Sequence, residues 1–328
     1  MVRYFKSNNP SLIFFLVFYL LILGLPLVFG DQLSITSSST APFSALIYSI
    51  TKLLFNNNYY ILLALGLVLV FIQAILVNVL VNNANIFRND TYVPSLVYLL
   101  LSALFIEYLV LSPVLMASTI IVFIFKKLTT FYRKKECTLD IFDAGLLVGI
   151  CSLFYFPGII LLGIVFIALA VFRGFYWREW LTSLLGFLTV YFLTGTYYFV
   201  VDQLPMFFQQ HFSIVHSIGI DFAEPKILVL GGFSIIFLFF SAFSIQSNYL
   251  KSPIQIRNLF MLAGWSLFFL FCSVLFTSTL TLNHFLILNV PLSLIFTYLF
   301  MHIEKRWIAD LVYMVYFAVI IYFQYFTV

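Results

Sequence analysis

The sequence predicts an all-α fold, a polytopic transmembrane helix bundle of about 11 helices that occupies residues 1–328 as a single domain. Hydrophobic residues make up 63% of the 328-residue chain and charged residues only 9%, whereas an ordinary soluble domain has about 25% charged residues. Apolar runs that approach the roughly 20 residues of a bilayer-spanning helix recur along the whole chain. No soluble fold of this size could bury so much apolar surface.

The first apolar run, residues 11–29, follows Arg3 and Lys6 and could be mistaken for a secretory signal. It is longer than the roughly 7–15 residues of a signal core, so we expect a membrane anchor. The other apolar runs, which are separated by polar and charged segments, predict ten further spans. These lie near residues 59–82, 94–111, 113–127, 142–156, 157–172, 180–200, 227–245, 259–280, 284–302 and 308–327.

The distribution of Lys and Arg predicts the topology, because these residues stay on the cytoplasmic side when they lie in short loops. Of the sixteen Lys and Arg residues, the predicted spans place only Lys52 and Lys226 on the outer side. The N-terminus is then cytoplasmic and the C-terminus periplasmic, in a bacterial inner membrane. A basic inner face follows from this topology and suits anionic lipid headgroups, so it indicates no nucleic-acid partner.

The longest stretches between spans, residues 30–58 and 201–226, are both predicted on the outer side. Within the first, Ala45 to Phe55 has apolar residues at helical spacing. This pattern predicts a helix that lies along the membrane surface.

The fifth and sixth spans are short and meet at Phe156-Pro157-Gly158, where Pro ends a helix and Gly allows a turn. They form either a hairpin that dips into the membrane or two thinly spanning helices. Gly145 and Gly149 lie four apart on one face of the fifth helix, so we expect another helix to approach closely there.

Ionisable residues at membrane depth are costly and therefore informative. Glu107, near the outer end of the third span, is a candidate proton acceptor or general base; the alternative is a carboxylate that reaches the outer interface. Asp31 follows the first span and either marks a helix end or acts in catalysis.

The outer histidines predict no metal site. His211 and His216 lie five apart, rather than the four that place two ligands on one helix face, so they are solvated loop residues or proton-transfer groups. His284 opens the tenth span on the same side. The sequence contains no phosphate-cradling Gly loop, nucleophile elbow or zinc-protease helix, and no cofactor is predicted.

Four segments resemble an uncharacterised polytopic inner-membrane protein family of Bacteroidota bacteria, and the likeness extends over most of the chain. These segments are Arg88 to Pro94 (RNDTYVP), Phe142 to Gly145 (FDAG), Ser152 to Pro157 (SLFYFP) and Phe172 to Trp180 (FRGFYWREW). The resemblance implies a membrane location and no particular activity.

The chain also bears a more distant resemblance to C-type glycosyltransferases, which take sugar from a polyprenyl-phosphate carrier on the outer face. The resemblance implies that Asp31 is the catalytic acidic residue of the first outer loop and that Ala45 to Phe55 is the membrane-surface helix after it. A polyprenyl phosphate is best stabilised by Arg or Lys, and the outer side offers only Lys52 and Lys226.

Three functions remain open at this point. We expect first a membrane-embedded subunit or scaffold of a cell-envelope assembly, which binds membrane lipid and other membrane or envelope proteins. The alternative is a lipid-linked glycosyltransferase with Asp31 as general base, Lys52 and Lys226 as phosphate-binding residues, and Glu107 or His211 in support. The second alternative is a proton- or cation-coupled transporter in which Glu107 binds the ion.

Overall fold

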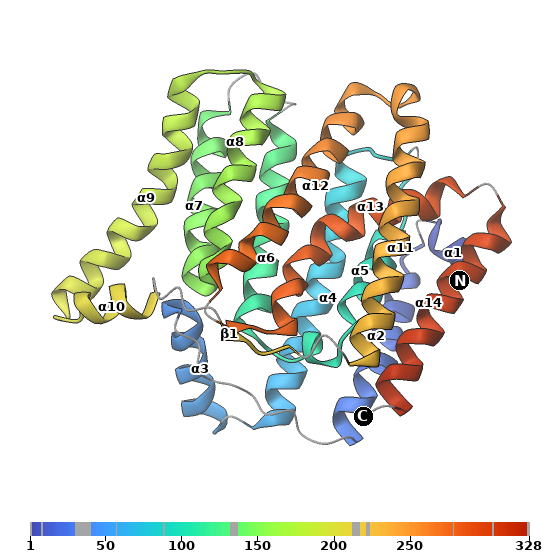
Figure 1. The fold of residues 1–328 in the computed structure, drawn as a ribbon, viewed down its shortest axis with the longest axis horizontal. Helices are drawn as coiled ribbons and strands as arrows, with labels where there is room; N and C mark the ends of the chain where they lie inside the picture. The colour runs from blue at the N-terminus through green and yellow to red at the C-terminus, as the bar shows by residue number, and fades with distance from the viewer. Residues whose placement is uncertain are drawn as a thin grey trace.

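The computed structural model is a bundle of helices that run between two ends, the top and the bottom of Figure 1. It describes residues 2–7, 9–29, 41–56, 58–87, 89–131, 137–211, 217–220, 224–277, 279–303 and 305–326. Extended pairing within these residues is confined to β1 (Ser217–Ile218), which lies parallel to β2 (Thr279–Leu280). The all-α prediction is confirmed.

The helices follow one another with short connections. The first half of the chain forms α1 (Val2–Phe5), α2 (Leu12–Phe29), α3 (Pro42–Phe55), α4 (Tyr59–Asn83), α5 (Val93–Ser102), α6 (Pro113–Thr130), α7 (Thr138–Phe154) and α8 (Leu161–Phe172). The second half forms α9 (Trp177–Val200), α10 (Leu204–His211), α11 (Pro225–Asn248), α12 (Ile254–Cys272), α13 (Asn289–His302) and α14 (Arg306–Phe326). Tighter 3-10 turns accompany them: η1 (Ile106–Leu109), η2 (Phe156–Ile160), η3 (Tyr249–Lys251), η4 (Ser273–Phe276) and η5 (Leu282–Leu288).

Eight helices in the described ranges are long and apolar enough to cross a membrane. They are α2, α4, α6, α9, α11, α12 with η4, η5 with α13, and α14. The other three predicted spans fall on shorter helices: α5 has 10 residues, α7 has 17 and α8 has 12. The fold is therefore compatible with a multi-pass membrane protein.

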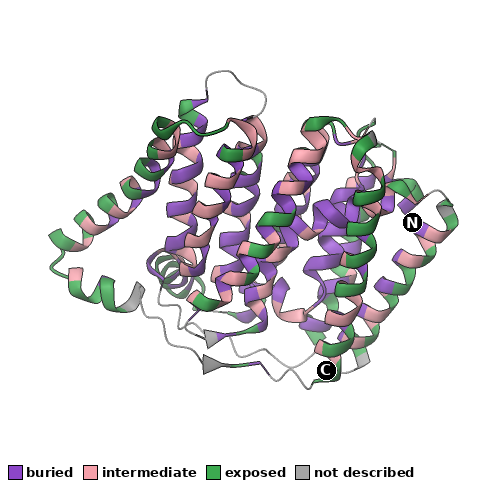
Figure 2. Cartoon of the chain, turned by 45° about the horizontal axis from the view of Figure 1, so that its top comes forward, coloured by how far each residue is buried: buried purple, intermediate pink, exposed green. Residues whose placement is uncertain are grey.

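Apolar side chains cover the outer surfaces of the peripheral helices. Only 17% of the most apolar 18-residue stretch of α11 is buried, whereas 72% of the corresponding stretch of η5 and α13 is buried. All residues of the central helix α5 are buried. Figure 2 shows this contrast between exposed peripheral helices and buried central ones. Exposing so much apolar area to water costs about 25 cal/mol per Å², so lipid is the solvent that this surface requires.

α7 and α9 approach to backbone contact through three glycines, which we call the glycine seam (Gly145, Gly149 and Gly186). A Cβ atom on Gly145 would overlap the carbonyl oxygen of Ser183, and one on Gly186 would overlap the carbonyl oxygen of Phe142. Gly149 faces the same helix. The predicted close approach at Gly145 and Gly149 is confirmed, and Gly186 supplies the other side of the contact.

The helix breaks differ in how well the sequence predicted them. The break at Phe156-Pro157-Gly158 is present as η2. The predicted span near residues 94–111 is wrong as one helix, because α5 ends at Ser102 and the chain is extended at Phe105 before η1. This second break places Glu107 outside any α-helix.

Candidate functional site at the lower end of the bundle

The lower end of the bundle in Figure 1 contains the 3-10 turns η1, η2, η4 and η5 and the strands β1 and β2. η1 contacts η5 there, η2 contacts η4, and β1 pairs with β2. α3, α10 and the C-terminus lie at the same end (Figure 1), which the sequence assigns to the outer side. At membrane depth irregular backbone persists only where it is buried in protein or lines water, so these breaks make the lower end the candidate functional site.

The break in α5 is held by polar groups from two distant helices. The Gln324 side-chain amide of α14 donates from Nε2 to the Ala103 carbonyl oxygen at 2.6 Å. The Leu111 amide donates to the Leu62 carbonyl of α4 at 3.3 Å. α6 then begins after Ser112, whose Oγ accepts from the Leu115 amide at 3.1 Å as an N-cap. The interrupted backbone is therefore ordered by specific partners.

Glu107 lies half-buried in η1, outside the eight long apolar helices. Burial raises the pKa of its carboxyl above the ordinary value; the positive charge of Lys226 opposes this shift and the negative charge of Glu224 adds to it. Lys226 itself forms an ion pair with Glu224, with 3.5 Å between Nζ and Oε2. Glu107 thus favours its protonated form more strongly than an exposed glutamate does.

His284 is almost completely buried in η5 and joins η2, η4 and η5 through its two ring nitrogens. The Tyr155 hydroxyl lies 2.6 Å from Nδ1, and Ser273 Oγ lies 3.1 Å from Nε2. Because Ser273 donates its own proton to the Leu270 carbonyl, it accepts from Nε2, which therefore carries a proton. In a neutral imidazole Nδ1 then accepts from the Tyr155 hydroxyl, so both ring nitrogens are bonded and His284 connects the broken helices.

A second polar network lies deeper, between α4, α5 and α6. Gln73 Nε2 contacts the Leu115 carbonyl, Ser118 Oγ and Thr119 Oγ1 at 2.8, 2.9 and 2.7 Å. Its Oε1 accepts from the Tyr98 hydroxyl at 2.8 Å. Interhelical hydrogen bonds of this kind stabilise membrane bundles by roughly 0.6 kcal/mol each, and the Gln73 amide is satisfied by them.

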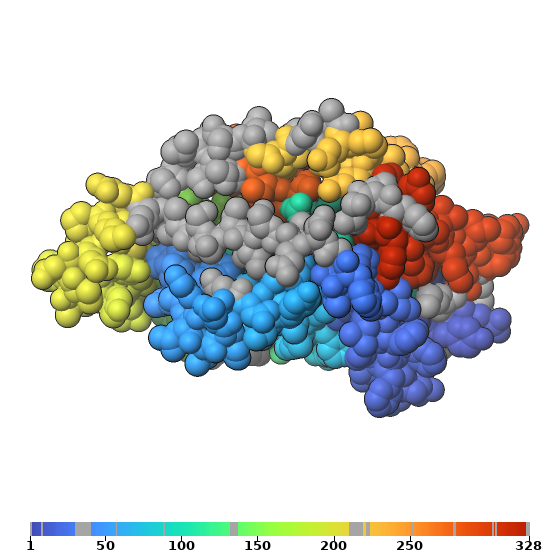
Figure 3. Space-filling model, turned by 90° about the horizontal axis from the view of Figure 1, so that it is seen from below, coloured from blue at the N-terminus to red at the C-terminus, as the bar shows by residue number. Residues whose placement is uncertain are grey.

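α3 docks at the lower end and presents two exposed strips. Tyr48, on its buried face, donates its hydroxyl proton to the Leu111 carbonyl at 3.0 Å, next to the end of the α5 break. The exposed apolar strip consists of Leu46, Ile50, Leu53 and Leu54, and the exposed polar strip consists of Ser49, Lys52 and Asn56. Figure 3 shows α3 beside the start of α4 at this end, with α10 beyond it. The predicted amphipathic helix is confirmed, and its place on a membrane surface stays a prediction.

The structure brings only some of the predicted site residues together. Glu107 and Lys226 lie within electrostatic range of each other, whereas Lys52 is exposed on α3. Asp31 lies outside the described residues, and so does the side chain of His211, which ends α10.

Reasoning from the sequence missed Tyr155, Ser273 and Gln324 at the lower end and Gln73 in the deeper network. A signal was present for the two glutamines, because each is a polar residue inside an otherwise apolar run and such residues usually find a partner across helices. Tyr155 gave no such signal, since the chain contains twenty tyrosines.

Comparison of the chain with protein-family models, curated proteins and solved structures gave no match. The proposals for function therefore rest on the sequence and the structure of this chain.

Proposed function

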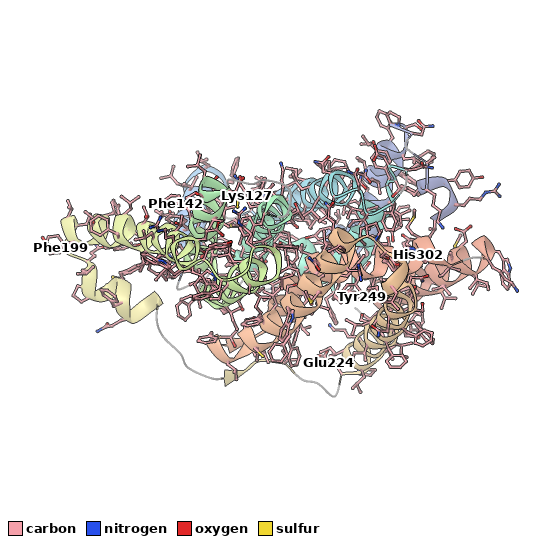
Figure 4. The ribbon with its side chains drawn as sticks, turned by 90° about the horizontal axis from the view of Figure 1, so that it is seen from above. Lys127, Phe142, Phe199, Glu224, Tyr249 and His302 are labelled. Atoms are coloured by element: carbon pink, nitrogen blue, oxygen red, sulfur yellow. The ribbon has the colours of Figure 1, made fainter. Side chains whose placement is uncertain are left out.

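We propose that this protein is a membrane-embedded subunit or scaffold of a cell-envelope assembly in the bacterial inner membrane. The observation that carries the proposal is the α9–α10 arm, which we define as residues 192–211. α9 is held to the bundle by the glycine seam in its first half, and its second half leans away from the bundle and continues into α10 (Figure 1). Phe199 lies at the far edge of the molecule in Figure 4.

The arm has a surface suited to another membrane protein. Its exposed large apolar side chains are Phe192, Leu193, Tyr197, Phe199, Val200, Val201, Met206 and Phe208. Gly195 has open space where a Cβ would be, so a partner helix could approach the backbone closely. Aromatic side chains with low conformational entropy are frequent anchors of protein contacts, which supports a protein neighbour for this arm.

Photo-crosslinking in native membranes tests the proposal. A benzophenone amino acid in place of Phe199 should give a discrete protein adduct. The matched control is Tyr322, an exposed aromatic residue near the lower end of α14, which should give lipid adducts only. The two side chains are similarly exposed, at 67% and 56%. If Phe199 also gave only lipid adducts, and purification returned no stoichiometric partner, the proposal would be abandoned.

A second candidate, the lipid-linked glycosyltransferase, is favoured by the position of α3. The helix lies at the lower end with Lys52 on its polar strip beside an apolar strip, an arrangement that suits an amphipathic carrier lipid. In this proposal Asp31 is the general base, Lys52 and Lys226 bind phosphate, and Glu107 or His211 assists. The pairing of Lys226 with Glu224 reduces the charge available for phosphate. Transfer of a polyprenyl-linked sugar should be lost in Asp31→Asn and kept in Asp202→Asn; normal transfer by Asp31→Asn would exclude this role.

The transporter remains a third candidate because α5 is discontinuous. Interrupted helices commonly form ion sites in transporters, and Glu107 follows the interruption directly. Ion flux into proteoliposomes should fall in Glu107→Gln and persist in Glu224→Gln. Flux that is insensitive to Glu107→Gln would remove this candidate.

A further inference from the structure

Arg257 is a basic residue at the upper end of the bundle that has no acidic partner. It lies in the first turn of α12, and its Nε is buried without a hydrogen-bond partner among the described residues. Its guanidinium lies over the ring of Tyr249, 5.6 Å from the ring centroid. The ring attracts the cation but does not replace an oxygen acceptor, and a buried charged donor without an acceptor is destabilising. The guanidinium therefore lacks an anion.

The chain itself supplies no such anion within the described residues. The ion pairs there involve Lys127, Arg173 and Lys226, and none involves Arg257. Residues 225–303 of the sequence contain neither Asp nor Glu. Arg173 shows the contrast, because its Nε and Nη2 lie 3.0 and 2.9 Å from the two carboxylate oxygens of Glu179. The anion that Arg257 lacks must come from outside the chain.

The surroundings of Arg257 select the phosphate of a lipid as this anion. α11 and α12 meet through η3 at the upper end of the bundle (Figure 1), which the sequence assigns to the cytoplasmic side. Figure 4 labels Tyr249 at this connection, seen from above. Leu250 and Ile254 beside it are apolar and exposed by 86% and 57%. A phospholipid carries its phosphate directly above its acyl chains, so one molecule can contact both the guanidinium and these apolar side chains.

The charge at this place favours an anionic lipid. Arg257 is partly exposed, so a headgroup can approach its guanidinium. The start of α12 adds a partial positive charge of about half an elementary charge, and Pro253 before it provides no side-chain cap. Basic pockets between helices on the cytoplasmic side bind anionic headgroups in other membrane proteins.

We propose that the α11–α12 connection binds the headgroup of one anionic phospholipid, with Arg257 as the charged donor to its phosphate and Tyr249 as the residue that positions the guanidinium. The site goes beyond the proposed scaffold role, because it is formed inside one chain and needs no partner protein.

Native mass spectrometry of the purified, delipidated full-length protein tests the site. The protein is titrated in detergent with phosphatidylglycerol or with phosphatidylcholine, which carries a phosphate but no net charge. The wild type should bind one phosphatidylglycerol more tightly than any phosphatidylcholine. Arg257→Gln should weaken this affinity by about tenfold, which corresponds to about 1.4 kcal/mol. Tyr249→Leu should also weaken it, and this variant tests the site should Arg257→Gln fail to fold.

The matched control is Arg178→Gln. Arg178 is another arginine over an aromatic ring, 5.8 Å from the ring centroid of Trp177, but it is exposed. The control loses the same charge and should bind phosphatidylglycerol as the wild type does. Equal affinities for the two lipids, or equal losses in Arg257→Gln and Arg178→Gln, would show unspecific attraction and overturn the proposal. Displacement of phosphatidylglycerol by an excess of inorganic phosphate would identify free phosphate as the ligand and overturn the assignment to a lipid.

Discussion

Replacing Gly186 by Ala should separate α7 from α9, whereas replacing Gly195 by Ala in the same helix should not. The added methyl group at Gly186 meets the carbonyl oxygen of Phe142 and comes within 3.0 Å of the Leu146 amide nitrogen. Both are backbone atoms, which cannot move aside by changing a rotamer. The helices themselves must shift, and the arm carried by α9 shifts with them.

The size of the effect follows from two opposing contributions. Overpacking a well-packed contact costs about 1–3 kcal/mol, and the overlap with backbone favours the upper part of this range. Because Ala has a higher helix propensity than Gly, the same substitution also stabilises the helix by up to about 1 kcal/mol. Gly186→Ala should therefore destabilise by about 2 kcal/mol. Gly195→Ala meets nothing within 4 Å and should be neutral or stabilise by up to about 1 kcal/mol.

Thermal unfolding of the two variants in the same nanodisc measures this difference directly. Gly186→Ala should melt several degrees below Gly195→Ala. Crosslinking from Phe199 should also weaken in Gly186→Ala, because the seam sets the direction of the arm. Equal melting temperatures for the two variants would refute the backbone contact between α7 and α9.

Three further substitutions probe the lower end. His284→Ala leaves the buried Tyr155 hydroxyl without its acceptor and should lower the unfolding free energy by about 1–3 kcal/mol, measured by thermal unfolding. Burial raises the folded-state pKa of Glu107 above its ordinary 4.5, so the wild type loses stability as the pH rises from 4.5 through the raised pKa. Glu107→Gln should remove this loss. The variant should therefore melt at a higher temperature than the wild type at pH 7 but not at pH 4. Tyr48→Phe breaks the bond from α3 to Leu111 and should cost about 0.5–1.5 kcal/mol, and protease cleavage within α3 should become faster.

Hydropathy predicted the helices of this protein well because the backbone of a lipid-exposed segment must bond to itself. Each apolar run other than the one near residues 94–111, which is divided between α5 and η1, falls on a helix, and Pro157 correctly predicted the break at η2. The break in α5 could not be predicted in this way. Residues 99–111 contain neither Pro nor Gly, and Gln324, which bonds to the free carbonyl, lies 221 residues further along the chain.

The candidate site was harder to predict because the sequence does not show which polar and charged side chains pair with one another. Lys226 stood out as one of two outer basic residues, yet it forms an ion pair with Glu224, two residues before it. His284 was predicted only as the start of a span, and its partners Tyr155 and Ser273 come from two other segments. Glu107 stood out in the sequence as a single acid between apolar neighbours, and the structure places it half-buried in η1; its role as a proton acceptor or general base stays a prediction.

The positions of the two termini favour an odd number of membrane crossings. The Arg3 amide donates to Asp310 Oδ1 at 3.3 Å, near the start of α14. α14 then extends for 21 residues, about 31 Å at 1.5 Å per residue, and near its other end Tyr325 donates to the Ile22 carbonyl at 2.7 Å. If α14 crosses the membrane, the termini lie on opposite sides, and an even number of crossings is impossible.

If all eight long helices cross, they alone make an even number, and an odd total then requires one or all three of α5, α7 and α8 to cross as well. Eleven crossings, as the sequence predicts, satisfy this condition. A fluorescent reporter that is active only in the cytoplasm should fluoresce when it is fused to the N-terminus. A phosphatase reporter that is active only outside should work at the C-terminus. Both termini on one side of the membrane would contradict the topology, and the lower end would lose its assignment to the outer face.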